Sequence, residues 1–139
     1  MKNEEKIKET LYDIITPGDL VEEQLGGWIS KRQPGKDIEP GCFMIGDFVF
    51  DARIWAKGSE PHKLTPPMRD DDREALKASI GEQGILEQIT INHTGEVIDG
   101  YHRLSTWLQH VLYGKVLSPP PYRLVRFSSA EAESSFVMS

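Results

Sequence analysis

The residues best suited to chemistry stand together at Asp99-Gly100-Tyr101-His102-Arg103. A short apolar pair, Val97-Ile98, precedes this segment, and a helical apolar pattern begins directly after it. This order predicts a strand that ends at an acidic-glycine corner and leads into a helix. Free N–H groups at a helix N-terminus favour an anion such as phosphate, and the side chains of His102 and Arg103 would add directed hydrogen bonds. The corner is therefore a candidate anion-binding site.

Each residue of the corner suits this chemistry, but each also has an ordinary structural interpretation. Gly100 lets a backbone approach a ligand closely, and Arg103 offers a fork of donors to phosphate oxygens. His102 can donate a hydrogen bond from the appropriate tautomer. Equally, His102 and Arg103 could be polar residues of a first helical turn, and Asp99 an N-cap. Five residues by themselves do not decide between the two interpretations.

The elements that would position the corner can be located by their apolar spacing. A helix begins at Asp70-Asp71-Asp72 and ends at Gly81 or Gly84. A strand over 85–92, a turn at 92–95 and the apolar pair 97–98 follow. The helix after the corner has a core-facing stripe and ends at Gly114, and a last strand over 122–127 leads into a short helix from Ser128. The stripe comprises Leu104, Trp107, Leu108, Val111 and Leu112.

The first half of the chain carries less chemistry. Apolar spacing predicts an amphipathic helix over 3–15 and a second, shorter helix starting at Asp19, and residues 30–41 suggest an exposed loop. Gly46-Asp47 predicts the turn of a hairpin within 42–55, with Phe48, Phe50 and Ile54 toward the core. Residues 57–68 are expected to form a long loop.

Composition limits the classes of protein that remain. The 139 residues carry a net charge of −6, which opposes non-specific binding to DNA or anionic membranes. Cys42 is the only cysteine, so there is no internal disulfide, and no zinc-type spacing joins it to the histidines. Its apolar neighbours suggest an inert thiol. Asp70 to Asp72 suggest a helix start more than a metal site. Without an apolar N-terminal segment, we expect a cytoplasmic protein with no membrane span.

From about Arg69 to Glu133, the order of signatures resembles the ParB/sulfiredoxin-like superfamily. The segment Ala78-Ser79-Ile80-Gly81-Glu82-Gln83-Gly84-Ile85-Leu86 resembles its helix-to-strand junction. Asp99 to Arg103 stands where its members have a nucleotide-contacting turn, and Tyr122 to Ser128 resembles the following strand. The resemblance implies a single α+β domain with a small mixed sheet and flanking helices. Its core would span 41–139, with residues 1–40 forming an N-terminal helical extension.

The chain departs from both well-known branches of that superfamily. Tyr101 stands where sulfiredoxins have their catalytic cysteine, and a phenol cannot perform thiol chemistry, so we do not expect a sulfinic acid reductase. His102 stands where partition proteins have an arginine. The sequence ends at Ser139 without the helix-turn-helix region of those proteins, so we do not expect partition function.

The resemblance also implies roles for individual residues. Gly100, His102 and Arg103 would contact the phosphates of a nucleotide, ATP or CTP, with the hydroxyl of Ser79 nearby. Asp99 would hold Mg²⁺ or accept a proton from an attacking hydroxyl, which makes Asp99 and His102 the candidate catalytic residues.

Three functions follow from these expectations. The first is nucleotide binding, with hydrolysis or phosphoryl transfer left open. The second is a ParB-like nuclease or DNA-binding accessory protein, which requires the basic residues to share one face. The third is a non-catalytic module that docks a protein partner through its N-terminal helices. The acidic balance favours the first. The basic residues concerned are Lys31, Arg32, Lys36, Arg123 and Arg126.

Overall fold

The computed structural model describes residues 11–58 and 67–138 of the chain. The predicted helix over residues 3–10 and the predicted loop over 59–66 therefore lie outside the described residues. In chain order the elements are β1 (Tyr12–Ile14), the 3-10 turns η1 (Pro17–Asp19) and η2 (Glu22–Gln24), β2 (Ile29–Lys31), β3 (Cys42–Ile45), β4 (Phe48–Asp51), α2 (Ala52–Gly58), α3 (Asp70–Gln83), β5 (Ile89–Asn92), β6 (Val97–Asp99), α4 (Tyr101–Leu112), β7 (Tyr122–Phe127) and α5 (Ala130–Met138).

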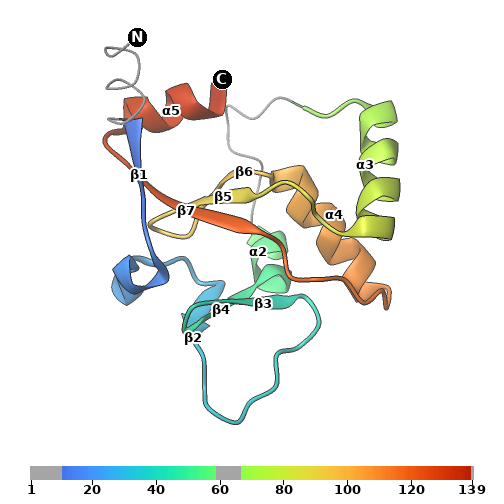
Figure 1. Cartoon of the computed structure of the whole chain (residues 1–139), viewed down its shortest axis with the longest axis horizontal. Coiled ribbons are helices and arrows are strands. Elements are labelled where there is room, and N and C mark those ends of the chain that lie inside the picture. The colour runs from blue at the N-terminus through green and yellow to red at the C-terminus, as the bar shows by residue number, and fades with distance from the viewer. Residues whose placement is uncertain (1–10, 59–66, 139) are drawn as a thin grey trace.

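The strands form two separate sheets (Figure 1). The four-stranded sheet has the order β1-β7-β5-β6; β5 and β7 run parallel, and the other neighbours are antiparallel. The three-stranded sheet has the order β2-β4-β3 and is antiparallel throughout. The predicted α+β class with a mixed sheet is confirmed. The second sheet as a separate unit was not predicted.

The N-terminal segment differs most from the sequence-based prediction. Tyr12–Ile14 is strand β1, so the predicted helix does not continue to Ile15. Asp19 does not start a helix either, because its carboxylate accepts hydrogen bonds from the backbone N–H and the hydroxyl of Thr16, at 2.9 and 3.0 Å. Residues 12–40 instead contribute one strand to each sheet. The prediction of an N-terminal helical extension is therefore wrong for these residues.

The predicted hairpin is confirmed as β3 and β4, joined at Gly46-Asp47. Gly46 has φ +59°, the left-handed conformation that such tight turns need. Alternate residues face the core, and Phe48 and Phe50 are buried as predicted. The prediction for Ile54 is wrong, because residues 52–58 form helix α2 and its periodicity leaves Ile54 half exposed.

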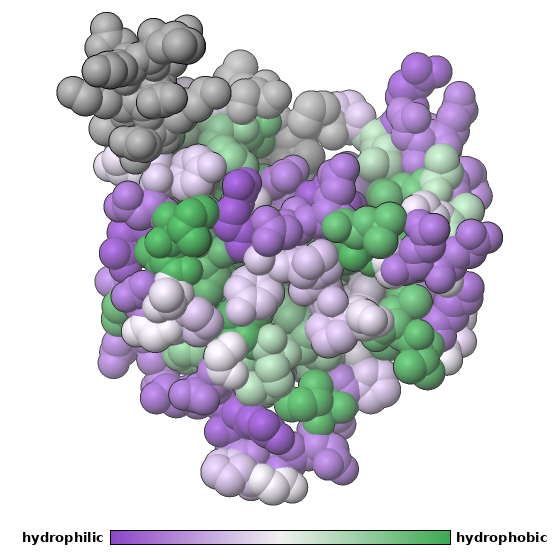
Figure 2. Space-filling view, viewed as in Figure 1, coloured by the Kyte–Doolittle hydropathy of each residue, from purple (hydrophilic) through white to green (hydrophobic). Residues whose placement is uncertain are grey.

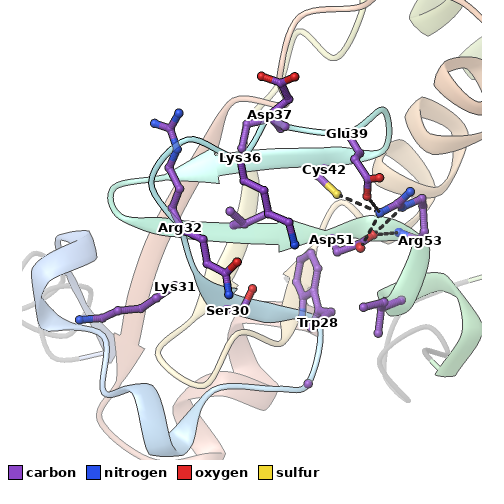
Figure 3. A pocket seen from close by; sticks show the side chains of 15 residues that line it. Trp28, Ser30, Lys31, Arg32, Lys36, Asp37, Glu39, Cys42, Asp51 and Arg53 are labelled. Atoms are coloured by element: carbon purple, nitrogen blue, oxygen red, sulfur yellow. Dashed lines mark hydrogen bonds and ion pairs between the residues drawn. The ribbon is translucent and has the colours of Figure 1, made fainter.

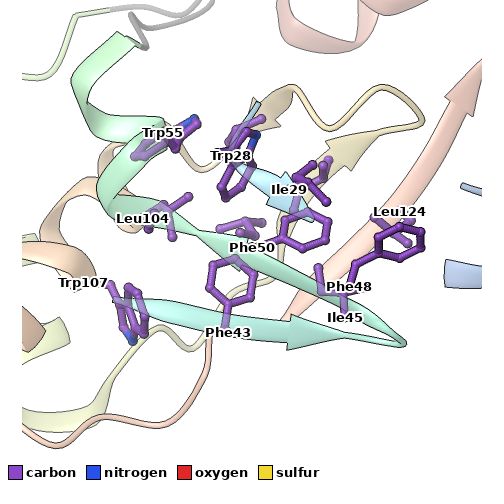
Figure 4. Packing of buried hydrophobic residues seen from close by; sticks show 14 of the residues in the cluster. Trp28, Ile29, Phe43, Ile45, Phe48, Phe50, Trp55, Leu104, Trp107 and Leu124 are labelled. Carbon is purple, nitrogen blue, oxygen red and sulfur yellow. The ribbon is translucent and has the colours of Figure 1, made fainter. Parts of the chain in front are cut away.

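An aromatic core joins the two sheets (Figure 4). Trp28 packs against Phe50 at a centroid distance of 5.0 Å, and Phe43 contacts both Phe50 and Trp107 of α4. The indole N–H of Trp28 also donates to the backbone carbonyl of Gly95, in the β5–β6 turn, at 3.1 Å. Trp28 therefore links the three-stranded sheet to the hairpin of the four-stranded sheet.

Helices α3 and α4 pack against each other beside the four-stranded sheet (Figure 1). Helix α3 begins with the three aspartates and ends at Gly84, whose φ of +73° identifies it as the terminating glycine rather than Gly81. The strand expected over 85–92 is shorter, because only Ile89–Asn92 pairs with neighbours. In α4 the predicted residues Leu104, Trp107 and Leu108 are buried, Val111 is partly buried, and Leu112 is 55% exposed. The prediction for Leu112 is wrong because the last turn extends past the core.

The surface is mixed. On the face shown in Figure 2, apolar side chains form small patches separated by polar ones. Among the described residues, no helix has the length and hydrophobicity needed to cross a membrane.

Candidate functional site

The structure brings the predicted site residues together. Asp99, Gly100, His102 and Arg103 line a cavity of about 350 Å³, and Ser79 of α3 lines the same cavity. Helix α3 reaches the corner because it packs along α4, although Ser79 lies 20 or more residues away in the sequence. A volume of this order suits a small-molecule site, for which about 300–1,000 Å³ is usual.

Gly100 forms the corner between β6 and α4. It is the N-cap of α4 with φ +100° and ψ +18°, a left-handed conformation that other residues adopt at a cost. A Cβ atom here would lie 2.6 Å from Cγ2 of Ile89 and 3.1 Å from Nη2 of Arg103. Asp99 is therefore not the N-cap, and no described side chain caps the helix. The positive end of the helix dipole lies at this first turn, where it favours an anionic ligand.

Arg103 is held in place by its neighbours. Its guanidinium donates to the backbone carbonyl of Gln88 at 3.0 Å and to the carboxylate of Asp99 at 3.3 Å, and it lies 3.6 Å from the carboxylate of Glu87. The side chain is only 20% exposed. Its Nε is buried and finds no hydrogen-bond partner among the described residues. The guanidinium of Arg103 is thus held beside the cavity, where two nearby carboxylates partly offset its positive potential.

Tyr101 and His102 are positioned by aromatic packing. The Tyr101 ring lies 5.2 Å from that of Trp55 and 5.4 Å from the imidazole of His102, the latter in an edge-on arrangement. This row ties the first turn of α4 to helix α2 and restricts the direction in which His102 points. The imidazole is therefore held in a defined orientation at the cavity wall.

Asp99 can supply one carboxylate to a cation. Its side chain is 55% exposed and its ion-pair partner is Arg103. Within residues 11–58 and 67–138, no three His, Cys, Asp or Glu side chains form a cluster that could hold a metal. Mg²⁺ is commonly held by one or two carboxylates together with substrate phosphates. Asp99 therefore fits Mg²⁺ that arrives with a nucleotide, whereas a metal held by the protein alone does not fit the described residues.

Many residues that line this cavity were not among the predicted site residues. Its remaining wall is largely apolar and comes from Met68, from α3 and from the segment that follows α3, and Leu86 on its rim is 70% exposed. An apolar wall opposite a polar helix start suits a ligand with a flat ring and an anionic group. The spacing of apolar residues in α3 was the only available sequence signal. These apolar residues are Met68, Leu76, Ile80, Ile85 and Leu86.

A second cavity was missed altogether. It measures about 450 Å³ and lies on the outer face of the three-stranded sheet, at the loop of residues 32–41 (Figure 3). At one end, Arg53 donates to Asp51 at 2.9 Å and to Glu39 at 2.8 Å, and it lies 3.5 Å from Sγ of Cys42. Cys42 thus has a basic neighbour, contrary to prediction. Burial and the nearby Asp51 nevertheless raise the pKa of its thiol, so its reactivity stays low.

Three of the five basic residues proposed for DNA binding lie close together. Lys31, Arg32 and Lys36 line the second cavity. Arg123 instead stacks on the rings of Tyr12 and Phe136, at 5.4 and 5.5 Å, and donates to the hydroxyl of Thr90. It therefore does not contribute to an open basic face.

Comparison of the chain with known proteins gives no match. No family model matches it, and neither the curated proteins nor the solved structures contain a match. The assignment of the corner therefore depends on its own residues and geometry.

Proposed function

We propose that this protein binds a nucleoside triphosphate, ATP or CTP, together with Mg²⁺, at the cavity around Gly100, in the manner of the ParB/sulfiredoxin-like proteins whose turn it resembles. One observation carries the proposal. The hydroxyl-bearing Ser79 and the first turn of α4, distant in sequence, line one cavity of about 350 Å³.

The phosphates would lie against the start of α4, where the positive end of the helix dipole attracts an anion. Gly100 has no Cβ, which lets Ile89 and the guanidinium of Arg103 pack closely against this corner. The apolar wall from α3 to Leu86 would receive the base. The guanidinium of Arg103 forms an ion pair with the carboxylate of Asp99 at 3.3 Å. A cation bound by Asp99 would weaken this ion pair, and the guanidinium could then turn toward a phosphate.

Hydrolysis or phosphoryl transfer would use groups of the same cavity. Asp99 is exposed enough to accept a proton from a water or hydroxyl, and His102 lies on the same wall. When bound, Mg²⁺ would supply charge stabilisation at the phosphates.

Isothermal titration with the four ribonucleoside triphosphates and MgCl₂ tests the proposal. Ser79→Glu places a carboxylate in the cavity from an exposed helix position, and we expect it to weaken triphosphate binding by at least about tenfold through repulsion. Ala78→Glu is the matched control. It adds the same charge at the adjoining exposed position of α3, which does not line this cavity.

The control should bind within about twofold of wild type, since an exposed charge outside the site is largely screened. Circular dichroism should show the same fold for both variants. The proposal is contradicted if no triphosphate binds, or if the two variants weaken binding equally.

A further inference from the structure

The second cavity, lined by residues from Gly27 to Ile54, shares no lining residue with the cavity at Gly100. Its floor is the outer face of the three-stranded sheet. In this sheet Ser30 pairs with Val49, and Cys42 pairs with Asp51, so all four side chains project from the same face. The aromatic residues of the strands project to the opposite face, into the core. The sheet therefore presents a mixed polar and apolar floor.

The loop of residues 32–41 forms the other wall of this cavity, and hydrogen bonds and an ion pair hold it near both of its ends. Near its start, the N–H of Lys36 donates to the carbonyl of Gln33 at 3.2 Å, and Gly35 has φ +80°. This turn places Pro34 and Gly35 at central positions that favour them. Near its end, Glu39 pairs with Arg53, and the N–H of Cys42 donates to the carbonyl of Glu39 at 3.0 Å. The cavity is therefore bounded by a loop of defined course.

Charges are separated along this cavity (Figure 3). Arg53, Asp51 and Glu39 satisfy one another at one end. Toward the other end stand three exposed cations, Lys31, Arg32 and Lys36, whose side chains make no hydrogen bond or ion pair with a described residue. Lys36 extends over the sheet into the cavity, whereas Lys31 and Arg32 extend outward at its mouth (Figure 3).

This concentration of cations is unusual for a chain with a net charge of −6. Four lining residues are basic and three are acidic, and two of those three acids already pair with Arg53. An anion entering at Lys36 would therefore meet unpaired positive charge and little repulsion. Because Arg32 is exposed, it can turn toward the anion, whereas Lys31 pairs with Phe48 and projects from the opposite face of the sheet.

The same cavity has an apolar component. Ile38 and Ile54 are 38% and 50% exposed, and Trp28 and Val49 also line it. Isolated exposed apolar residues are common on protein surfaces, but Ile38 and Ile54 line one open cavity together with the cations. A purely inorganic anion would leave this apolar surface unused.

We propose that this cavity binds a small organic anion. Its carboxylate, sulfonate or phosphate group would be held by Lys36 with Arg32, and its apolar body would lie against Ile38 and Ile54. The volume of about 450 Å³ is within the range of small-molecule sites. This binding is independent of the nucleotide, since the two cavities have separate walls.

A fluorescence titration with 1-anilinonaphthalene-8-sulfonate tests the proposal, with uncharged N-phenyl-1-naphthylamine as the matched probe. The sulfonate should bind saturably with one site. Lys36→Glu should weaken it on the order of tenfold, because a charge reversal in the site changes attraction to repulsion. Lys57→Glu makes the same change at an exposed position of α2 outside the cavity and should leave affinity within about twofold.

Lys36→Glu should leave binding of the uncharged probe unchanged, and circular dichroism should show both variants folded. The proposal is overturned if the sulfonate does not bind saturably, or if Lys36→Glu and Lys57→Glu act equally. It is also overturned if Ser79→Glu removes sulfonate binding while Lys36→Glu does not, because the probe would then occupy the cavity at Gly100.

Discussion

The two cavities differ in how their charges are held. At the corner, Arg103 is fixed between the Gln88 carbonyl and the Asp99 carboxylate, in a site built from two helices and the end of a strand. On the outer sheet face, the side chains of Arg32 and Lys36 have no hydrogen bond or ion pair with a described residue. A pre-paired cation favours selectivity, because a ligand must displace an internal partner. Free cations favour fast capture of many anions.

Trp28 connects the two sheets, so its removal should have the largest effect. It packs in the aromatic core, lines the sheet-face cavity and donates to the buried carbonyl of Gly95. Trp28→Ala should lower the free energy of unfolding by about 3–5 kcal/mol. Trp28→Phe keeps much of the apolar contact but leaves the carbonyl of Gly95 without its hydrogen bond from Trp28. It should lower the free energy of unfolding by about 1–3 kcal/mol.

Urea denaturation measures both changes. A loss below about 1 kcal/mol for Trp28→Ala would mean that the sheets are stabilised independently of this residue.

Gly100→Ala should be the next most damaging change. Its left-handed backbone disfavours a Cβ, and that atom would also contact Ile89 at 2.6 Å. We expect a loss of about 2–4 kcal/mol in the free energy of unfolding, from backbone strain and overpacking together. Gly114→Ala isolates the strain, because Gly114 has φ +97° with open space around it. It should cost about 1–2 kcal/mol. Equal losses would contradict a tightly packed corner.

The sequence anticipated the corner well for a physical reason. Asp99 to Arg103 are consecutive, and a strand followed by an amphipathic helix fixes their relative positions through local geometry alone. Helix α3 was recognised from its acidic start, and its terminating glycine was narrowed to two candidates. Ser79 lines the same cavity, close to the corner as predicted, because α3 and α4 pack together.

The sheet-face cavity could not be anticipated in this way. Its walls depend on which strands pair with one another. Strand β2 could not be recognised from the sequence, because its segment has no clear apolar periodicity. Tyr12–Ile14 was missed as a strand for a related reason, because apolar spacing compatible with a helix was overridden by pairing with β7, far along the chain. The bond between Arg53 and Glu39 likewise joins residues with no local sequence signal.

Asp51→Asn tests whether the ion-paired end supports the sheet-face cavity. Hydrogen bonds from Arg53 hold the pKa of Asp51 below its usual 3.8. A lowered pKa in the folded state adds stability above pH 3.8 that is lost as the pH falls below it. The variant should be about 1–2 kcal/mol less stable at pH 7, with the difference shrinking below pH 3.8.

Urea denaturation at pH 7, 5 and 3 measures this difference. Asp37→Asn is the control, since Asp37 lines the same cavity but is exposed and makes no ion pair with a described residue. It should change stability by less than about 0.5 kcal/mol at each pH. A pH-independent loss in Asp51→Asn would contradict the role given to its charge.

The smallest expected effect concerns Glu87, which lies 3.6 Å from Arg103 and is 83% exposed. Glu87→Gln removes a negative charge from the cavity while stability should hardly change, because exposed ion pairs contribute little. Affinity for a triphosphate should rise by about two- to threefold. Isothermal titration in low and high salt checks this, and the gain should shrink as salt screens the charge. Weaker binding would indicate that Glu87 contacts the ligand.

The most direct measurement is an amide chemical-shift titration with Mg²⁺–ATP and Mg²⁺–CTP. If the nucleotide binds at the corner, the largest changes should fall on Gly100 to Arg103 and on Ser79, with residues 30–42 unaffected. Shifts confined to residues 30–42, or no shifts with either triphosphate, would contradict nucleotide binding at the start of α4.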